Sequence, residues 1–203
     1  MQMNDIRFVY FDLGRVVVDN EASFALLSRK TGVSYERITE FFDRYWKAAC
    51  LGKISSVDHL AIFKKGLKIR TDAPDFAEFW SAFHVQIKET VGLINDLKGR
   101  VKLGVLSNAE PGVFEKNMER DKIPNPPWDA TVISCDVGYV KPDIRIYKIA
   151  QARAGVAPSQ IFYTDDRQEN IDVARVLGWQ TQLFVKEDIP ATMRRLRKAL
   201  GLN

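Results

Sequence analysis

Five short runs rich in aliphatic, β-branched and aromatic residues constrain the fold of this chain more than any other feature of its sequence. The runs cover residues 8–11, 101–106, 130–134, 160–164 and 180–184, and polar residues close the first four. Such runs are typical of buried strands in a parallel sheet. Helical stretches separate them. Strands that alternate with helices predict an α/β fold with a doubly wound, Rossmann-like parallel sheet.

The first interval between the predicted strands breaks this alternation. Residues 21–90 contain no predicted strand, and their apolar and aromatic residues recur at helical spacing, with Ser34 and Ser56 as the predicted N-caps. We predict three to four helices that form a helical-bundle cap over residues 20–90. Residues 1–19 and 91–203 would form the core domain. The aromatic residues of the cap are interpreted as core rather than ligand-binding.

From residue 91 onward the predicted strands alternate with predicted helices. These helices cover residues 91–97, 111–120, 144–154, 168–177 and 189–200, and a proline-rich stretch at 124–127 predicts a rigid loop. Five strands connected in this way would bring their carboxyl ends to one edge of the sheet, where open α/β sheets bind ligands.

Composition and charge exclude several classes of function. No run approaches the roughly 20 apolar residues of a membrane helix, and the polar N-terminus carries no signal peptide, so we expect a cytoplasmic protein. The net charge of +4 is compatible with anionic small molecules. No basic patch interleaved with aromatic residues is visible, so nucleic acid is not an expected partner.

Neither the cysteines nor the histidines are placed for catalysis or metal binding. Cys50 and Cys135 lack metal-ligand spacing and are predicted to be reduced thiols. His59 and His84 fall in helical-looking segments away from the strand ends. The candidate chemistry therefore rests on other residues.

Polar residues follow four of the predicted strands. They are Asp12, the pair Ser107-Asn108, Lys141, and the pair Asp165-Asp166. Three carboxylates without a histidine indicate a hard, oxygen-ligated cation such as Mg²⁺. Such a cation, together with a lysine, suits a phosphoryl group, and a neighbouring carboxylate can attack phosphorus to form an aspartyl phosphate.

Each of these elements also has a purely structural explanation. The role of Asp12 could be limited to tightening the turn after its strand, and Ser107-Asn108 could form an ordinary turn at the end of a strand. Lys141 alone could be a surface lysine, and Asp165-Asp166 could cap the helix that follows. The order and placement of all four elements together favour a site.

As a set, these residues resemble the four motifs of the haloacid dehalogenase-like hydrolases. The motifs are Phe11-Asp12-Leu13-Gly14, Leu106-Ser107-Asn108, the segment 138–143 and the segment 165–170. The resemblance extends from about residue 7 to residue 186 and includes a helical cap inserted after the first strand. The Asp-Leu-Gly form of the first motif resembles a subgroup that includes sugar-phosphate phosphatases.

The resemblance implies a role for each residue of the motifs. Asp12 would be the nucleophile and a Mg²⁺ ligand, and the backbone carbonyl of Gly14 would be a second ligand. Ser107 and the amide of Asn108 would bind the phosphoryl group, whose charge Lys141 would stabilise together with that of the nucleophile.

The motif of the segment 165–170 would complete the metal site. Asp166 would contact the metal directly and Asp165 through water, or the reverse. Glu169 and Asn170 would support the loop and the start of the following helix.

Gly14 departs from the pattern of the phosphatases in this superfamily, which usually carry a second aspartate there as general acid and base. Loss of such a group slows the reaction by 10²–10⁴-fold, which corresponds to an increase of roughly 3–5 kcal/mol in the activation barrier. Asp19, Arg15 or a cap residue such as Lys53 could lie near the gap. A substrate with a good leaving group would depend least on the missing acid.

The leading hypothesis is a Mg²⁺-dependent phosphatase of a small phosphorylated metabolite, with sugar phosphates among the candidates. The first alternative is a non-catalytic relative that binds a phosphorylated ligand or a partner protein, which Gly14 favours. A 2-haloacid dehalogenase is the third hypothesis, and the paired acids Asp165-Asp166 argue against it because they would repel a carboxylate substrate. We expect a monomer or weak homodimer with no membrane partner.

Overall fold

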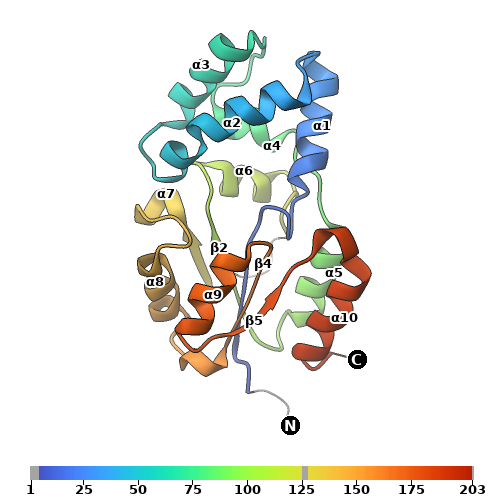
Figure 1. Cartoon of the computed structure of the whole chain (residues 1–203), viewed down its shortest axis with the longest axis vertical. Coiled ribbons are helices and arrows are strands. Elements are labelled where there is room, and N and C mark those ends of the chain that lie inside the picture. Colours follow the sequence, from blue (N-terminus) through green and yellow to red (C-terminus); the bar gives the residue numbers. More distant parts are fainter. Residues whose placement is uncertain (1–4, 125–127, 203) are drawn as a thin grey trace.

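The computed structural model describes residues 5–124 and 128–202. Its centre is a five-stranded parallel sheet with the strand order β3-β2-β1-β4-β5 (Figure 1). The strands are β1 (Phe8–Phe11), β2 (Lys102–Ser107), β3 (Ala130–Ile133), β4 (Ile161–Asp165) and β5 (Gln180–Leu183). This order confirms the predicted doubly wound sheet. The winding reverses between β1 and β4, and at such a switch point open α/β sheets form their ligand crevice.

The buried residues of β1 explain why helices cover both faces of the sheet. Successive side chains of a strand point to opposite faces. Val9 and Phe11 accordingly join one hydrophobic cluster, while Phe8 and Tyr10 join another. Both faces of this central strand therefore need a cover.

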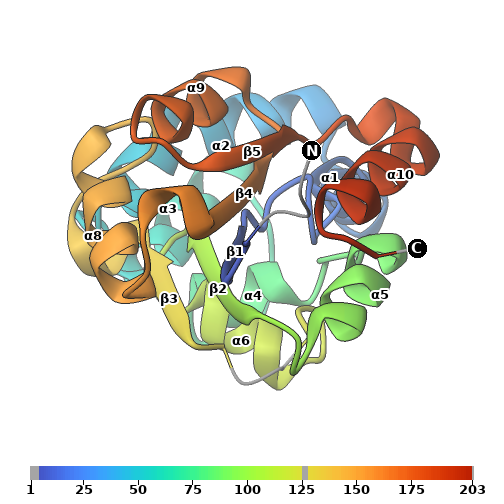
Figure 2. The same ribbon diagram turned by 90° about the horizontal axis from the view of Figure 1, so that it is seen from below.

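Two pairs of helices provide that cover, one pair on each face (Figure 2). The cluster of Val9 and Phe11 includes residues of α5 (Lys88–Leu97) and α10 (Ile189–Ala199). The cluster of Phe8 and Tyr10 includes residues of α8 (Ile144–Ala154) and α9 (Gln168–Val176). These four helices lie close to where the sequence predicted them.

A helical insert lies between β1 and β2, above the carboxyl ends of the strands (Figure 1). It contains α1 (Asn20–Thr31), α2 (Tyr35–Cys50), α3 (Ser56–Leu67) and α4 (Phe76–Ser81). These helices bury their apolar faces in a cluster of their own, here called the insert core, which includes Leu27, Ile38, Phe63 and Phe76. The insert confirms the prediction that the chain leaves the β/α alternation after the first strand.

The predicted N-cap at Ser34 is confirmed, but the one at Ser56 is wrong. The Ser34 hydroxyl accepts a hydrogen bond from the amide of Arg37. In the next helix Ser55 is the cap, because Asp58 lies three residues later and both its amide and its carboxylate contact the Ser55 hydroxyl. The Ser56 hydroxyl instead accepts a hydrogen bond from the amide of Ala77 and so joins α3 to α4.

Some other boundaries differ from the sequence prediction. Ser134 does not end β3 but begins a short helix, α7 (Ser134–Val137), because its hydroxyl binds backbone groups of Cys50 and Ala109. The helix predicted from residue 111 is shorter, α6 (Val113–Glu119). Most of the predicted rigid loop, residues 125–127, lies outside the described residues.

Both cysteines are free thiols: Cys50 is buried and Cys135 is partly buried. Helices of the described ranges, 5–124 and 128–202, all fall short of the length and apolar character that crossing a bilayer demands.

Candidate active site

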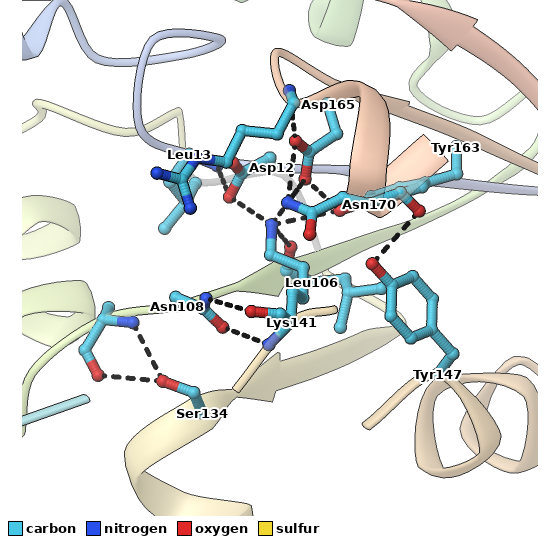
Figure 3. A network of polar contacts seen from close by, with 12 residues as sticks. Asp12, Leu13, Leu106, Asn108, Ser134, Lys141, Tyr147, Tyr163, Asp165 and Asn170 are labelled. Carbon is cyan, nitrogen blue, oxygen red and sulfur yellow. Dashed lines mark hydrogen bonds and ion pairs between the residues drawn. The ribbon is translucent and has the colours of Figure 1, made fainter. Parts of the chain in front are cut away.

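Lys141 lies between two buried carboxylates at the carboxyl ends of β1 and β4 (Figure 3). Its Nζ is 2.9 Å from Asp12 Oδ1 and 2.7 Å from Asp165 Oδ2. The same nitrogen donates hydrogen bonds to the carbonyl of Leu106 and the hydroxyl of Tyr163, both at 3.0 Å. Asp12, Lys141, Tyr163, Asp165 and Asn170 are here called the polar cluster.

Asp165 is the most completely bonded member of the polar cluster. The Asn170 amide donates to both of its carboxylate oxygens at 3.0 Å, and the backbone amide of Arg167 donates to Oδ1 at 2.8 Å. Lys141 and the Tyr163 hydroxyl donate to Oδ2. Its hydrogen-bonding capacity is therefore used by the protein itself, which a buried carboxylate requires.

Burial and neighbouring charges give the carboxylates different acidities. Burial raises the pKa of Asp12, the charges of Asp165 and Asp166 raise it further, and Lys141 opposes them. Burial also acts to raise the pKa of Asp165, but the contacts from Lys141, Tyr163 and Arg167 hold it below its ordinary value. The Lys141 pKa is raised by the two carboxylates against the effect of burial, so this lysine is positively charged.

Three carboxylates form a donor set that fits a divalent metal ion. One oxygen each from Asp12, Asp165 and Asp166 can be chosen so that all lie within 4.8 Å of one another. The set offers only hard oxygen donors, which suits Mg²⁺ rather than a metal that prefers nitrogen or sulfur. Since Asp165 is already bonded to protein donors, Asp12 and Asp166 are the members with oxygens left for a cation.

The strand-end residues of β2 take different positions. The Asn108 side chain fixes the backbone of Lys141, because its Oδ1 accepts from the Lys141 amide at 2.8 Å and its Nδ2 donates to the Lys141 carbonyl at 3.1 Å. Ser107 is buried at the end of β2. The structure thus brings Asn108 to the pocket, while Ser107 is not among the residues that line it.

The space beside Gly14, where the expected acid side chain would lie, is partly filled by another side chain. A Cβ added to Gly14 would lie 2.9 Å from Nδ2 of Asn20, the first residue of α1. A side chain at position 14 would therefore need Asn20 to move. Of the residues expected near this gap, Arg15 lines the pocket, and Asp19 caps α1 and pairs with Lys186. Lys53 is not among the lining residues in the described part of the chain.

A pocket of about 180 Å³ opens above Asp12, between the sheet edge and the insert. The sheet side contributes Asp12, Gly14, Arg15, Asn108, Lys141, Asp166, Arg167 and Asn170. The insert contributes Phe24, Phe42, Asp43 and Trp46. The guanidinium of Arg167 lies 5.9 Å from the centre of the Trp46 ring, so it contacts the insert across the pocket.

Sequence reasoning missed the pocket wall that the insert provides. Phe42 and Trp46 are four residues apart on α2, and helical spacing alone assigns both to the core of the insert. Phe42 does contact that core, yet it also faces the pocket. Tyr163 was missed as well, and its polar hydroxyl within the buried strand β4, two residues before Asp165, was the available signal.

A larger hollow of about 750 Å³ lies at the opposite end of the sheet. Basic side chains such as Arg7, Lys98 and Arg100 line it together with Asp129. It holds a single carboxylate, so the pocket above Asp12 is the better candidate for chemistry despite its smaller volume.

Comparison of the sequence with known protein families identifies the family to which this site belongs. The sequence profile described as haloacid dehalogenase-like hydrolase matches residues 11–184, from the first strand to the end of the last. The chain belongs to the haloacid dehalogenase-like hydrolase family. The matched range contains every residue of the four strand-end motifs, and the insert between β1 and β2 is the helical cap of this fold.

A curated relative of this chain is acyl-CoA dehydrogenase family member 10 of Mus musculus. It is 37% identical over 75 residues, which are 36% of this chain and 7% of that protein. The chain therefore spans a small part of the length of this relative.

Solved structures share the fold across nearly the whole chain. The BT-2542 enzyme of Bacteroides thetaiotaomicron, solved with magnesium and inorganic phosphate, has a TM-score of 0.70 at 19% identity, covering 89% of this chain and 95% of that one. An L-2-haloacid dehalogenase has a TM-score of 0.67 at 20% identity, covering 88% and 83%. The fold alone thus does not choose between phosphorus and carbon chemistry.

Proposed function

We propose that this hydrolase is a Mg²⁺-dependent phosphatase of a small phosphorylated metabolite, with sugar phosphates as the first candidates. The observation that carries the proposal is the arrangement at the pocket floor. Three carboxylates that can share one cation lie beside a buried lysine, and Lys141 Nζ is 2.9 Å from Asp12. A cation and an ammonium group together suit a substrate with two negative charges.

In this proposal Asp12, Asp166 and the Gly14 carbonyl would hold the Mg²⁺ ion. Asp165 would interact with the ion through water, and it orients Lys141, a role that its saturated hydrogen bonds support. When bound, the metal would neutralise charge on the phosphoryl oxygens and on the carboxylates. The backbone amide of Asn108 binds the phosphoryl oxygens, as would Ser107, whose buried side chain would have to turn toward the pocket. Lys141 stabilises the charge of these oxygens and that of Asp12.

The reaction takes place in two displacements at phosphorus. A carboxylate oxygen of Asp12 forms a bond to phosphorus while the bond to the leaving oxygen breaks, giving an aspartyl phosphate. Water then attacks phosphorus, which releases phosphate and restores the Asp12 carboxylate. The core domain, residues 1–19 and 91–203, supplies these groups, and the cap, residues 20–90, closes over the substrate and excludes water.

The pocket supports a small substrate with a good leaving group. Its volume of about 180 Å³ is below the 300–1,000 Å³ of pockets for drug-sized ligands. With Gly14 in the place of the usual acid, the leaving oxygen departs without a proton from that position. An anomeric sugar phosphate or an acyl phosphate meets this requirement better than an alkyl phosphate. The BT-2542 enzyme, solved with magnesium and inorganic phosphate, supports the choice of phosphorus chemistry.

Hydrolysis of p-nitrophenyl phosphate tests the proposal, because its good leaving group asks little of a general acid. The wild type should turn over this substrate with Mg²⁺ and not with excess chelator. Asp12→Asn should reduce turnover to background while leaving the fold unchanged by circular dichroism. A panel of sugar phosphates and a simple alkyl phosphate then follows. Equal rates on good and poor leaving groups would contradict the role given to Gly14.

Gly14 also favours a second candidate function, a non-catalytic binder of a phosphorylated ligand. Asn20 lies where the acid side chain would extend, and it carries no carboxylate. This function predicts Mg²⁺ binding by the wild type without turnover of any phosphate ester. A dehalogenase would instead release halide from 2-haloacids without metal, and the same preparation can be assayed for both.

A further inference from the structure

Arg15 lies directly after the position of the missing acid and contacts a proposed metal ligand. Its Nε is 2.8 Å from Asp166 Oδ2. Asp166 is partly buried, with 14% of its side chain exposed, so the pair is shielded from solvent on the carboxylate side. The contact uses one oxygen of Asp166 and leaves the other for a cation.

Two further carboxylates hold the Arg15 guanidinium in place. One terminal nitrogen pairs with Glu21 on α1, and the other is 3.1 Å from Glu187 in η2 (Lys186–Asp188). The fork of the guanidinium thus contacts the loop after β4, the first helix of the insert and the segment before α10. A planar, multiply bonded group of this kind fixes orientation better than a single flexible charge.

The backbone of Arg15 indicates that this placement is specific. Its φ of +60° lies in the left-handed region, which residues with a side chain rarely adopt. Its amide donates to the carbonyl of Val18 at 2.7 Å, which closes the turn between β1 and the insert. The turn therefore directs the side chain of Arg15 toward Asp166 rather than into solvent.

We infer that Arg15 is a positioning residue, which orients Asp166 as a ligand for Mg²⁺ and connects the metal site to the first helix of the insert. The inference rests on the proposed function, because it needs the carboxylates to bind Mg²⁺. Residues that orient metal ligands typically change metal affinity or activity by 10–100-fold when they are removed.

Charge and orientation predict opposite results for Arg15→Met, which makes the inference testable. Removing a positive charge near the carboxylates should by Coulomb's law tighten the binding of a cation. Loss of orientation should weaken it. Isothermal titration of MgCl₂ into the protein without substrate separates the two effects and does not depend on activity.

We expect Arg15→Met to raise the dissociation constant for Mg²⁺ about 10-fold or more. Arg15→Lys keeps the charge but loses the fork, so it should bind Mg²⁺ more weakly than the wild type and more tightly than Arg15→Met. Arg197→Met is the matched control, since Arg197 pairs with Asp96 between α10 and α5 at a similar exposure, and it should leave the dissociation constant unchanged.

Unchanged or tighter binding by Arg15→Met, in a protein whose circular dichroism matches the wild type, would overturn the inference while leaving the proposed function intact. If Arg15→Met does not fold, Arg15→Lys decides by the same criterion. Failure of the wild type to bind Mg²⁺ would overturn both the proposed function and the inference.

Discussion

The polar cluster at the strand ends and the insert core are both buried, but different interactions stabilise them. The polar cluster buries charges and offsets their desolvation by contacts among its own members, with Lys141 between two carboxylates. The insert core buries aromatic and aliphatic side chains, whose stabilisation is roughly proportional to the area removed from water. We therefore expect the polar cluster to tolerate substitution less well than the insert core.

The largest effect is expected from removing the central charge of the polar cluster. Lys141→Met leaves Asp12 and Asp165 buried without their cation, and breaking a buried ion pair from one side costs about 3–5 kcal/mol. Urea denaturation without metal would measure the free energy of unfolding. Lys148→Met, at an exposed lysine of α8, is the control and should be nearly neutral. A cost below about 1 kcal/mol for Lys141→Met would place the polar cluster among ordinary surface ion pairs.

A buried histidine, His59, packs against the insert core, and the pH dependence of stability should reveal it. His59 is buried against Phe76, both its ring nitrogens lack partners in the described ranges, and burial lowers its pKa from 6.5 to about 4. Between pH 4 and pH 6.5, His59 therefore binds a proton in the unfolded chain but not in the folded chain. The free energy of unfolding should fall as the pH falls from 6.5 toward 4, by about 3 kcal/mol for this group.

His59→Leu should remove this part of the pH dependence. Urea denaturation at several pH values between 4 and 7 would compare the variant with the wild type, and the difference between the two slopes isolates His59 from the remaining groups. Parallel curves would show that His59 does not remain neutral in the folded protein.

Tyr163→Phe is a smaller change to the polar cluster. It removes the hydroxyl that contacts both Lys141 and Asp165, and loss of one partner of a buried group costs about 1–3 kcal/mol. Tyr45→Phe is the control, because Tyr45 is a partly buried tyrosine of α2 whose ring packs on Phe41, away from the polar cluster. Chemical denaturation of both variants would test whether the loss in free energy of unfolding is specific to the polar cluster. Equal costs would contradict that assignment.

The smallest effect is expected from trimming the insert core. Ile38→Val removes one methylene group from a fully buried side chain, which typically costs 0.5–1.5 kcal/mol. Thermal denaturation would measure it, and turnover of p-nitrophenyl phosphate should persist. Loss of turnover in a folded Ile38→Val variant would mean that the packing of the insert core controls the pocket through a shared residue such as Phe42.

The same contrast explains what the sequence could predict. The strands, their parallel arrangement and the residues Asp12, Asn108 and Asp165 follow from local patterns, because a strand end fixes where its polar residue emerges. Lys141 lies beyond α7, and the resemblance to the family's motifs indicated its place in the site. The family match confirms the resemblance that these residues carry. Ser55, rather than Ser56, caps α3, which shows that even a correct helix can have its start misplaced by one residue.

The pocket wall and the contacts of Arg15 could not be predicted in this way. Phe42 and Trp46 look like core residues until the insert is placed over the sheet, and helical spacing carries no information on that placement. Arg15 meets Asp166 and Glu187 across more than 150 residues of sequence, through a turn with an uncommon backbone conformation. Such contacts depend on tertiary structure rather than on local propensity.

The proposed function requires that Asp12 becomes phosphorylated during turnover. Acid quenching of the wild type during hydrolysis of p-nitrophenyl phosphate with Mg²⁺, followed by peptide mapping with mass spectrometry, tests it most directly. We predict a phosphoryl adduct on the peptide that contains Asp12, absent from Asp12→Asn and from the sample with excess chelator. An adduct on a different residue, or undiminished turnover by Asp12→Asn, would contradict the account.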